Sequence, residues 1–125
     1  MPPGKHVDIL VVDDNEIIAD TTCEILKRFG FSVVAAYDGG MALRMAAEMC
    51  PDILLSDVMM PVMNGVELAI SVRKILPETA VLLVTGQATE DIFEDAGREG
   101  YFFETLNKPI HPVDLVGHLN RLRRT

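Results

Sequence analysis

Five short apolar runs alternate with five stretches of helical periodicity along this chain, and this alternation is the feature that most restricts its fold. The apolar runs lie near residues 7–12, 31–36, 52–56, 80–84 and 101–106, and the helical stretches lie near residues 15–29, 39–50, 65–76, 88–99 and 112–123. Regular alternation of strands and helices is typical of a parallel sheet with helices on both faces. The sequence therefore predicts an α/β domain.

The composition of the strands predicts their order in the sheet. The first, third and fourth runs are apolar nearly throughout, as in Val81–Val84. Strands of this kind are buried on both faces and lie in the middle of a parallel sheet. Crossovers between parallel strands are right-handed, which leaves few layouts for five short strands. We predict a flavodoxin-like, doubly wound sheet of five parallel strands in the order 2-1-3-4-5, with five helices, because this order gathers strands one, three, four and five around a switch point.

Two of the expected helices carry apolar stripes at helical spacing, so each should bury one side. The last helix carries Leu115, Leu119 and Leu122 on its stripe. Gly30 is the stop signal of the first helix. The stripe that we expect the first helix to bury consists of Ile18, Thr22, Ile25, Leu26 and Phe29.

Length and hydropathy indicate one soluble domain. A chain of 125 residues has room for one core and one site. Its hydrophobic fraction of 49% is ordinary for a globular protein, and no apolar stretch reaches the roughly 18 residues of a membrane span. Residues 1–6 lack the apolar core of a signal peptide. We therefore expect a loose tail over residues 1–6, a single domain over residues 7–125 and a cytoplasmic location.

The charge balance and the cysteine count argue against several classes of protein. The formal net charge of −8 opposes direct association with nucleic acid or an anionic membrane. Arg121, Arg123 and Arg124 make the C-terminus basic, which we interpret as cations at a helix end or a solvated tail. Cys23 and Cys50 are too few for a disulfide framework in a domain of this size, so we expect buried thiols.

Polar or charged residues stand at the ends of four apolar runs. Asp13 and Asp14 end the first run, Asp57 the third and Thr85 the fourth, and Lys108 follows the fifth. The carboxyl ends of parallel strands share one edge, where open α/β sheets bind ligands, so these side chains should converge. Two carboxylates about 4 Å apart repel by roughly 4 kcal/mol at an effective dielectric near 20, so the cluster calls for a cation as well as for Lys108. This composition is typical of a Mg²⁺-assisted phosphoryl-transfer site.

Each of these residues also has a purely structural interpretation. The pair Asp13 and Asp14 precedes a helix and can serve as an N-cap, with carboxylates near the positive end of the helix dipole. Asp57 can be a turn residue, and Thr85 can start the next helix. The site interpretation rests on the combination of five suitable residues at four neighbouring strand ends.

Five segments of the chain resemble the receiver domain of two-component response regulators, and the resemblance extends over nearly the whole length. The matching segments are Val11–Asp14, Pro51–Asp57, Met60–Gly65, Val84–Gly86 and Leu106–Ile110. Together these segments are highly specific for that family. The resemblance implies the fold predicted above and a role for each polar strand end.

In the metal site that the resemblance implies, Asp14, Asp57 and the backbone carbonyl of Met59 ligate Mg²⁺. Asp13 is then expected to reach the metal through water. Mg²⁺ prefers octahedral oxygen coordination and retains several waters, which suits this set of donors.

The resemblance further implies that Asp57 accepts the phosphoryl group, that Thr85 hydrogen-bonds a phosphoryl oxygen and that Lys108 pairs with the group. A carboxylate is a poor nucleophile toward an anionic phosphoryl group, so Mg²⁺ and Lys108 must neutralise its oxygens while Asp57 is held in line. A cis Lys108–Pro109 peptide is also implied, and an X–Pro bond makes cis cost only about 0.5–1 kcal/mol.

The expected function is that of a phosphoacceptor domain that receives phosphate from a sensor histidine kinase, a phosphotransfer protein or a small phosphodonor. Phosphorylation would change the surface of the fourth helix, fifth strand and fifth helix, which would bind an output partner or a second copy. No enzymatic activity is expected beyond self-directed phosphotransfer and autodephosphorylation. The alternatives are a phosphorylation-independent binding module, which would be expected to have lost one of the polar residues, and a Mg²⁺-dependent phosphohydrolase, which would need a further acid or base.

Three positions depart from the family pattern. Asn64 stands where aspartate is usual, and we expect little effect because asparagine takes the same turn conformation. Gly86 replaces the usual alanine, which should loosen the loop after Thr85. Thr105 occupies the position of the usual aromatic switch. One of the aromatic residues in Tyr101–Phe103 could take over that role, while core packing is the expected fate of at least two of them.

Overall fold

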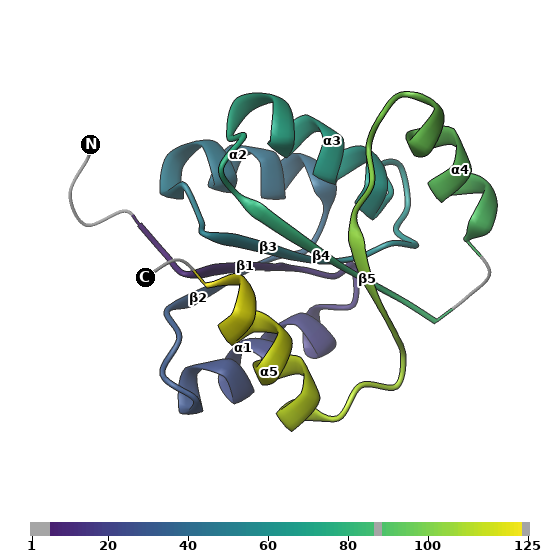
Figure 1. Cartoon of the computed structure of the whole chain (residues 1–125). Coiled ribbons are helices and arrows are strands. Elements are labelled where there is room, and N and C mark those ends of the chain that lie inside the picture. The colour runs from purple at the N-terminus through teal and green to yellow at the C-terminus, as the bar shows by residue number, and fades with distance from the viewer. Residues whose placement is uncertain (1–5, 87–88, 124–125) are drawn as a thin grey trace.

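The computed structural model describes residues 6–86 and 89–123, and within these ranges the chain forms five parallel strands and five helices (Figure 1). The strands are β1 (Ile9–Val12), β2 (Val33–Ala36), β3 (Ile53–Asp57), β4 (Ala80–Thr85) and β5 (Glu104–Asn107). The helices are α1 (Glu16–Arg28), α2 (Gly39–Met49), α3 (Gly65–Ile75), α4 (Glu90–Arg98) and α5 (Pro112–Leu122). The strand order β2-β1-β3-β4-β5 confirms the predicted flavodoxin-like fold, with β1, β3 and β4 in the middle of the sheet.

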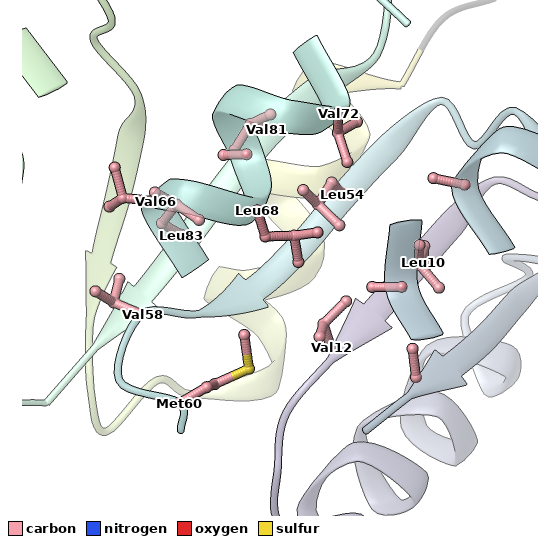
Figure 2. Close-up of a cluster of buried hydrophobic side chains, with 14 of the residues drawn as sticks. Leu10, Val12, Leu54, Val58, Met60, Val66, Leu68, Val72, Val81 and Leu83 are labelled. Carbon is pink, nitrogen blue, oxygen red and sulfur yellow. The ribbon is translucent and has the colours of Figure 1, made fainter. Parts of the chain in front are cut away.

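Two hydrophobic layers hold the helices on the sheet. The layer on the side of α2, α3 and α4 includes Leu10, Val12 and Leu54, and Figure 2 shows Leu54 beside Leu68 and Val72 of α3. The layer on the side of α1 and α5 includes Ile9 and Val11. Successive residues of β1 therefore serve opposite faces of the sheet, as the pleat of a strand requires.

The buried face of α1 differs from the predicted stripe. Of the predicted stripe, Leu26 is fully buried as expected, but Ile18 is 46% exposed and Phe29 is 49% exposed, while Ala19 and Cys23 are buried in their place. The buried residues follow a neighbouring i, i+4, i+7 stripe that is rich in small side chains. Small residues let the helix lie close to the sheet, so the larger apolar residues are displaced to its flanks; Thr22 and Ile25 are half-buried there. On α5, by contrast, the predicted stripe is confirmed, with Leu119 fully buried and Leu115 and Leu122 packed around it.

The fifth strand begins later than predicted, at Glu104, because the aromatic residues before it pack on the core instead of joining the sheet. The rings of Tyr101 and Phe103 are stacked with centroids 6.2 Å apart, and both contact the layer on the α3 side. The guanidinium of Arg73 lies 5.3 Å from the centroid of the Phe103 ring. Phe102 is 79% exposed. Two of the three aromatic residues therefore have the expected core-packing role.

Several smaller expectations concern the termini and the cysteines. Both cysteines are free; Cys23 is buried as expected, whereas Cys50 is only half-buried. Of the basic C-terminal residues, Arg121 pairs with an acidic side chain of β5 and Arg123 with one before β1. The expected loose tail over residues 1–6 lies outside the described residues except for its last member. Among the described helices, none is long and apolar enough to cross a membrane.

Candidate functional site

The carboxyl ends of β1 and β3 bring together the three aspartates that the sequence placed there. Asp13 and Asp14 follow β1, and Asp57 is the last residue of β3. One carboxylate oxygen from each lies within 4.8 Å of the corresponding oxygens of the other two. Three oxygen donors at this spacing fit a hard divalent cation such as Mg²⁺, because such a cation takes oxygen ligands and offsets the mutual repulsion of the carboxylates.

The start of α1 leaves the two acidic side chains available for this cluster. Asn15 is the N-cap of α1, and its side-chain oxygen accepts a hydrogen bond from the N–H of Ile18 at 3.2 Å. Asp13 is 7% exposed, and its Oδ1 accepts the N–H of Asn15 at 2.9 Å. Burial raises the pKa of the Asp13 carboxyl, and the nearby charge of Asp57 adds to this effect. The N-cap role is therefore filled by Asn15, not by the acidic pair.

Asp57 is held by two donors. Its Oδ1 accepts the N–H of Val58 at 3.1 Å and lies 3.1 Å from Nζ of Lys108. The Asp57 side chain is only 12% exposed, so its attraction to Lys108 is less screened than that of a surface pair. The peptide bond Lys108–Pro109 is cis, as the family resemblance implied. A buried carboxylate is thus paired with one ammonium and faces two further carboxylates.

The loop after β3 returns closely to the backbone of Asp57. The N–H of Gly65 donates to the carbonyl oxygen of Val58 at 2.8 Å. A Cβ atom on Gly65 would fall 2.2 Å from the carbonyl oxygen of Asp57, so only glycine fits at this position. Asn64 caps α3 through a reciprocal pair of hydrogen bonds with Glu67, each of 2.9 Å. Asparagine therefore caps α3 at this position, a role beyond the turn conformation that we expected of it.

Thr85 ends β4 and is linked to the other side of the site through its backbone. Its side chain is buried, and its carbonyl oxygen accepts the N–H of Lys108 at 2.9 Å. The hydroxyl oxygens of Thr85 and Thr89 lie 3.5 Å apart. Thr89 is the N-cap residue of α4, but its side chain caps no described backbone N–H of that helix. A Cβ atom on Gly86 would lie 3.4 Å from the stem of Lys108, an ordinary van der Waals contact, so the lysine stem leaves room for a small side chain at this position.

Two parts of the site were not among the residues predicted from the sequence. Thr89 was missed, although a threonine immediately before a helical stretch is an N-cap signal. The other part is the wall of a cavity of about 170 Å³ beside Asp57 and Lys108. Ile18 and Leu115 are among the residues of that wall, and their positions depend on how α1 and α5 pack on the sheet. Their apolar surface limits the access of water to one side of the site.

The two methionines after Asp57 have opposite environments. Met59, whose backbone carbonyl was predicted as a metal ligand, is 42% exposed at its side chain. Met60 is buried in the layer under α3 (Figure 2). The next residues make a tight turn in which Val62 has a φ of 70° and the N–H of Met63 donates to the carbonyl of Pro61 at 2.7 Å. This turn directs the chain from the site into α3.

A family model and the curated relatives both match this chain to response regulators. The model of the response regulator receiver domain family matches residues 9–120. A response regulator receiver protein of Anaeromyxobacter sp. is 40% identical over 101 residues, which cover 81% of this chain and 42% of that protein. The DNA-binding response regulator MtrA of Mycobacterium tuberculosis is 34% identical over 117 residues, which cover 93% of this chain and 50% of MtrA. The chain thus spans about half the length of these curated relatives.

Solved structures extend the comparison to the fold. A response regulator receiver domain protein of Clostridium thermocellum superposes with a TM-score of 0.83 at 32% identity, covering 93% of each chain. The chemotaxis protein CheY4 of Vibrio cholerae superposes with a TM-score of 0.81 at 31% identity, covering 94% of this chain and 98% of CheY4. The family match covers all five strands and most of α5. The chain therefore belongs to the family of response regulator receiver domains.

Proposed function

We propose that this chain is the phosphoacceptor domain of a two-component system, with Asp57 as the residue that is phosphorylated. The observation that carries the proposal is the 3.1 Å approach of the Lys108 ammonium to Oδ1 of Asp57, within a cluster of three carboxylates. The phosphoryl donor would be a sensor histidine kinase, a phosphotransfer protein or a small phosphodonor. The domain would extend over residues 7–125 and act in the cytoplasm.

Asp13, Asp14 and Asp57 would hold Mg²⁺, with the backbone carbonyl of Met59 as a further ligand. The three carboxylates fit this role because their oxygens converge within 4.8 Å and carry the charge that a divalent cation offsets. When bound, Mg²⁺ would supply charge neutralisation at the phosphoryl oxygens. Asp13 is the most buried of the three carboxylates and would orient metal-bound water rather than contact the ion.

In the proposed reaction, a carboxylate oxygen of Asp57 forms a bond to phosphorus while the bond from phosphorus to the donor atom breaks. With a phosphohistidine donor, the ring nitrogen leaves with the bonding electrons. Lys108 would pair with a phosphoryl oxygen in place of the Asp57 oxygen that it contacts now, and Thr85 would donate its hydroxyl to another. Most of the catalysis is then positioning and charge neutralisation.

The structure bears on how the phosphorylated state would be read out. Thr105 is exposed on β5, and the nearby rings of Tyr101 and Phe103 are stacked on the core. The position of the usual aromatic switch thus holds a threonine, and the two aromatic rings nearby pack against each other and the core. We propose that the hydroxyl of Thr85 instead acts on the start of α4 through Thr89, 3.5 Å away, and thereby changes the surface of α4, β5 and α5. An output partner or a second copy would bind there.

A phosphohydrolase acting on outside substrates is the weaker candidate. The cavity beside Asp57 has a volume of about 170 Å³, whereas pockets for small-molecule substrates commonly measure about 300–1,000 Å³. A phosphorylation-independent binding module would not need a buried carboxylate paired with Lys108. The phosphorylation-independent module is separated from the proposal by the experiment below, since it would give no adduct.

The test is phosphorylation by acetyl phosphate with Mg²⁺, followed by intact-mass and peptide mass spectrometry. We expect one phosphoryl group per chain on Asp57, no adduct on Asp57→Asn and no adduct in the presence of EDTA. The matched control is Asp95→Asn, which removes an exposed carboxylate of α4 and should leave labelling unchanged. Equal labelling of wild type and Asp57→Asn would contradict the proposal.

A further inference from the structure

The edge of the sheet opposite to the proposed phosphorylation site carries a second cluster of metal-ligating side chains. His6, Asp8 and Asp52 each place one ligand atom within 4.8 Å of those of the other two. The three residues come before β1 and β3, whereas the aspartates of the proposed phosphorylation site end β3 or follow β1. In Figure 1 this is the edge of the sheet from which β1 starts.

The pairing of the strands builds this second cluster. Asp8 immediately precedes β1 and Asp52 immediately precedes β3. Because Ile9 is paired with Ile53 in the register of the two strands, Asp8 and Asp52 stand side by side. The N–H of Ile53 donates to the carbonyl oxygen of Asp8 at 3.0 Å, which fixes the two backbones relative to each other. His6 reaches the two carboxylates from the segment before β1, and its ligand atom lies within 4.8 Å of those of Asp8 and Asp52.

The carboxylate of Asp8 is held in one orientation. Its Oδ2 accepts the N–H of Ser32 at 2.9 Å and a guanidinium N–H of Arg123 at 2.9 Å. These bonds leave the Oδ1 atom of Asp8 as the oxygen for a further ligand. Nε2 of His6 lies 3.4 Å from Oδ2 of Asp52. Among the described residues, Asp8 is thus paired with the guanidinium of Arg123 and Asp52 with the imidazole of His6.

We propose that His6, Asp8 and Asp52 form a binding site for Zn²⁺ or a divalent transition metal of similar preference. One imidazole nitrogen and two carboxylate oxygens form a mixed donor set that suits zinc, whereas Mg²⁺ prefers oxygen ligands alone. A cavity of about 320 Å³ adjoins His6 and Asp52, which gives space for water in the remaining coordination position. The site is separate from Asp57 and does not depend on its phosphorylation.

A metal at this position would join three segments. His6 belongs to the segment before β1, Asp52 to the start of β3, and Asp8 is bonded to Arg123 at the end of α5. The guanidinium of Arg123 also lies 4.8 Å from the centroid of the Phe31 ring before β2. Binding of the metal to the folded state alone would raise the melting temperature as a function of metal concentration.

The test is isothermal titration calorimetry of the tag-free protein with ZnCl₂ in saturating Mg²⁺, so that the three aspartates near Asp57 are already occupied. The variant His6→Asn removes an exposed imidazole and is expected to fold normally. The matched control His111→Asn also removes an exposed imidazole and retains an N-cap residue for α5. We expect one Zn²⁺ site in wild type and in His111→Asn, and a site weakened by about tenfold or more in His6→Asn.

A ¹H–¹⁵N NMR titration with ZnCl₂ locates the ion. We expect the largest shifts at Val7, Ile9 and Ile53, with phosphorylation by acetyl phosphate unchanged in His6→Asn. Equal affinity of wild type and His6→Asn, absence of binding, or shifts confined to residues 13–15 and 57–59 would overturn the proposal. In that case the His6–Asp52 pair is an ordinary surface ion pair.

Discussion

The backbone N–H of Lys108 donates a hydrogen bond to the carbonyl oxygen of Thr85 at 2.9 Å. This bond joins the last residue of β4 to the segment after β5. The bond extends the pairing of β4 with β5, in which Thr85 is the partner of Asn107. Thr85 and Lys108 are therefore joined through one pair of bonded strands, and we expect a displacement of Thr85 to act on the backbone of Lys108.

Lys108→Ala should slow the phosphorylation of Asp57 without unfolding the domain. The variant removes the ammonium that offsets charge on the phosphoryl oxygens, and loss of one such group typically reduces the rate by about 100-fold. The measurement is the rate of acetyl phosphate labelling at saturating Mg²⁺, followed by intact mass. Lys74→Ala, which removes an exposed lysine from the last turn of α3, is the control. A Lys108→Ala rate within twofold of wild type would remove the proposed role of Lys108.

Two glycine-to-alanine substitutions should change stability in opposite directions. Gly65→Ala would place a Cβ atom 2.2 Å from the carbonyl oxygen of Asp57, and because neither backbone can move freely, we expect a loss of about 3 kcal/mol or more. Gly117→Ala, inside α5, meets no described atom within 4 Å and should gain about 1 kcal/mol from helix propensity. Urea denaturation of both variants measures these changes. Equal changes in the free energy of unfolding for the two variants would show that the backbone at Gly65 lies farther from the Asp57 carbonyl oxygen than this structure has it.

Glu104 should make stability depend on pH in the acid range. Its carboxylate is bonded to Arg121 and lies 3.3 Å from Nδ1 of His118. The hydrogen bond from Arg121 lowers the pKa of Glu104 below its ordinary value of 4.5, and the bond from His118 acts in the same direction. A lowered pKa gives stability that is present above the unfolded-state pKa and is lost as the pH falls through the folded-state pKa.

Glu104→Gln therefore should be less stable than wild type above pH 4.5, and this difference should shrink as the pH falls below 4.5. The measurement is the free energy of unfolding of both proteins in urea across the acid range. A difference that stays constant over that range would mean that the charge of Glu104 contributes nothing. Because the side chain is partly exposed, added salt should reduce the difference at neutral pH.

The sequence was sufficient for the strand order and for the polar ends of the strands. Asp57 and Lys108 could be predicted to meet because strand polarity alone brings the carboxyl ends of parallel strands to one edge. The three aspartates then follow from their positions at the ends of β1 and β3. The order and direction of the strands are enough to bring these side chains together, and alternating apolar runs predict that order and direction well.

Features that depend on packing distances could not be predicted in the same way. On α1, two neighbouring stripes are apolar, and hydrophobicity favours the one with Ile18 over the one with Ala19. The separation of helix and sheet selects the smaller residues instead. Thr89 faces Thr85 only because α4 begins just after the loop from β4, and the second cluster at His6 depends on the register between β1 and β3.

The surface formed by α4, β5 and α5 should change most when Asp57 is phosphorylated. The carbonyl oxygen of Thr85 accepts a hydrogen bond from the N–H of Lys108, and the hydroxyl oxygens of Thr85 and Thr89 lie 3.5 Å apart. Movement of Thr85 toward a phosphoryl oxygen therefore acts on the start of α4 and on the segment that leads into α5. Since Tyr101 and Phe103 are stacked on the core, we expect their ring signals to change little, and Phe103→Leu should leave the response of α4 in place.

The measurement is a ¹H–¹⁵N NMR shift map with and without beryllofluoride and Mg²⁺, with Asp57→Asn under the same conditions as the control. We expect the largest changes away from the site over Glu90–Arg98 and Pro112–Leu122, with smaller ones in β5. A partner that carries the population of the active form from 1:99 to 99:1 must favour it by about 5.5 kcal/mol, and by reciprocity it must favour phosphorylation to the same extent. If the changes are instead concentrated on α1 and α2, with no change on α4 and α5, this prediction is wrong and the output surface includes α1 and α2.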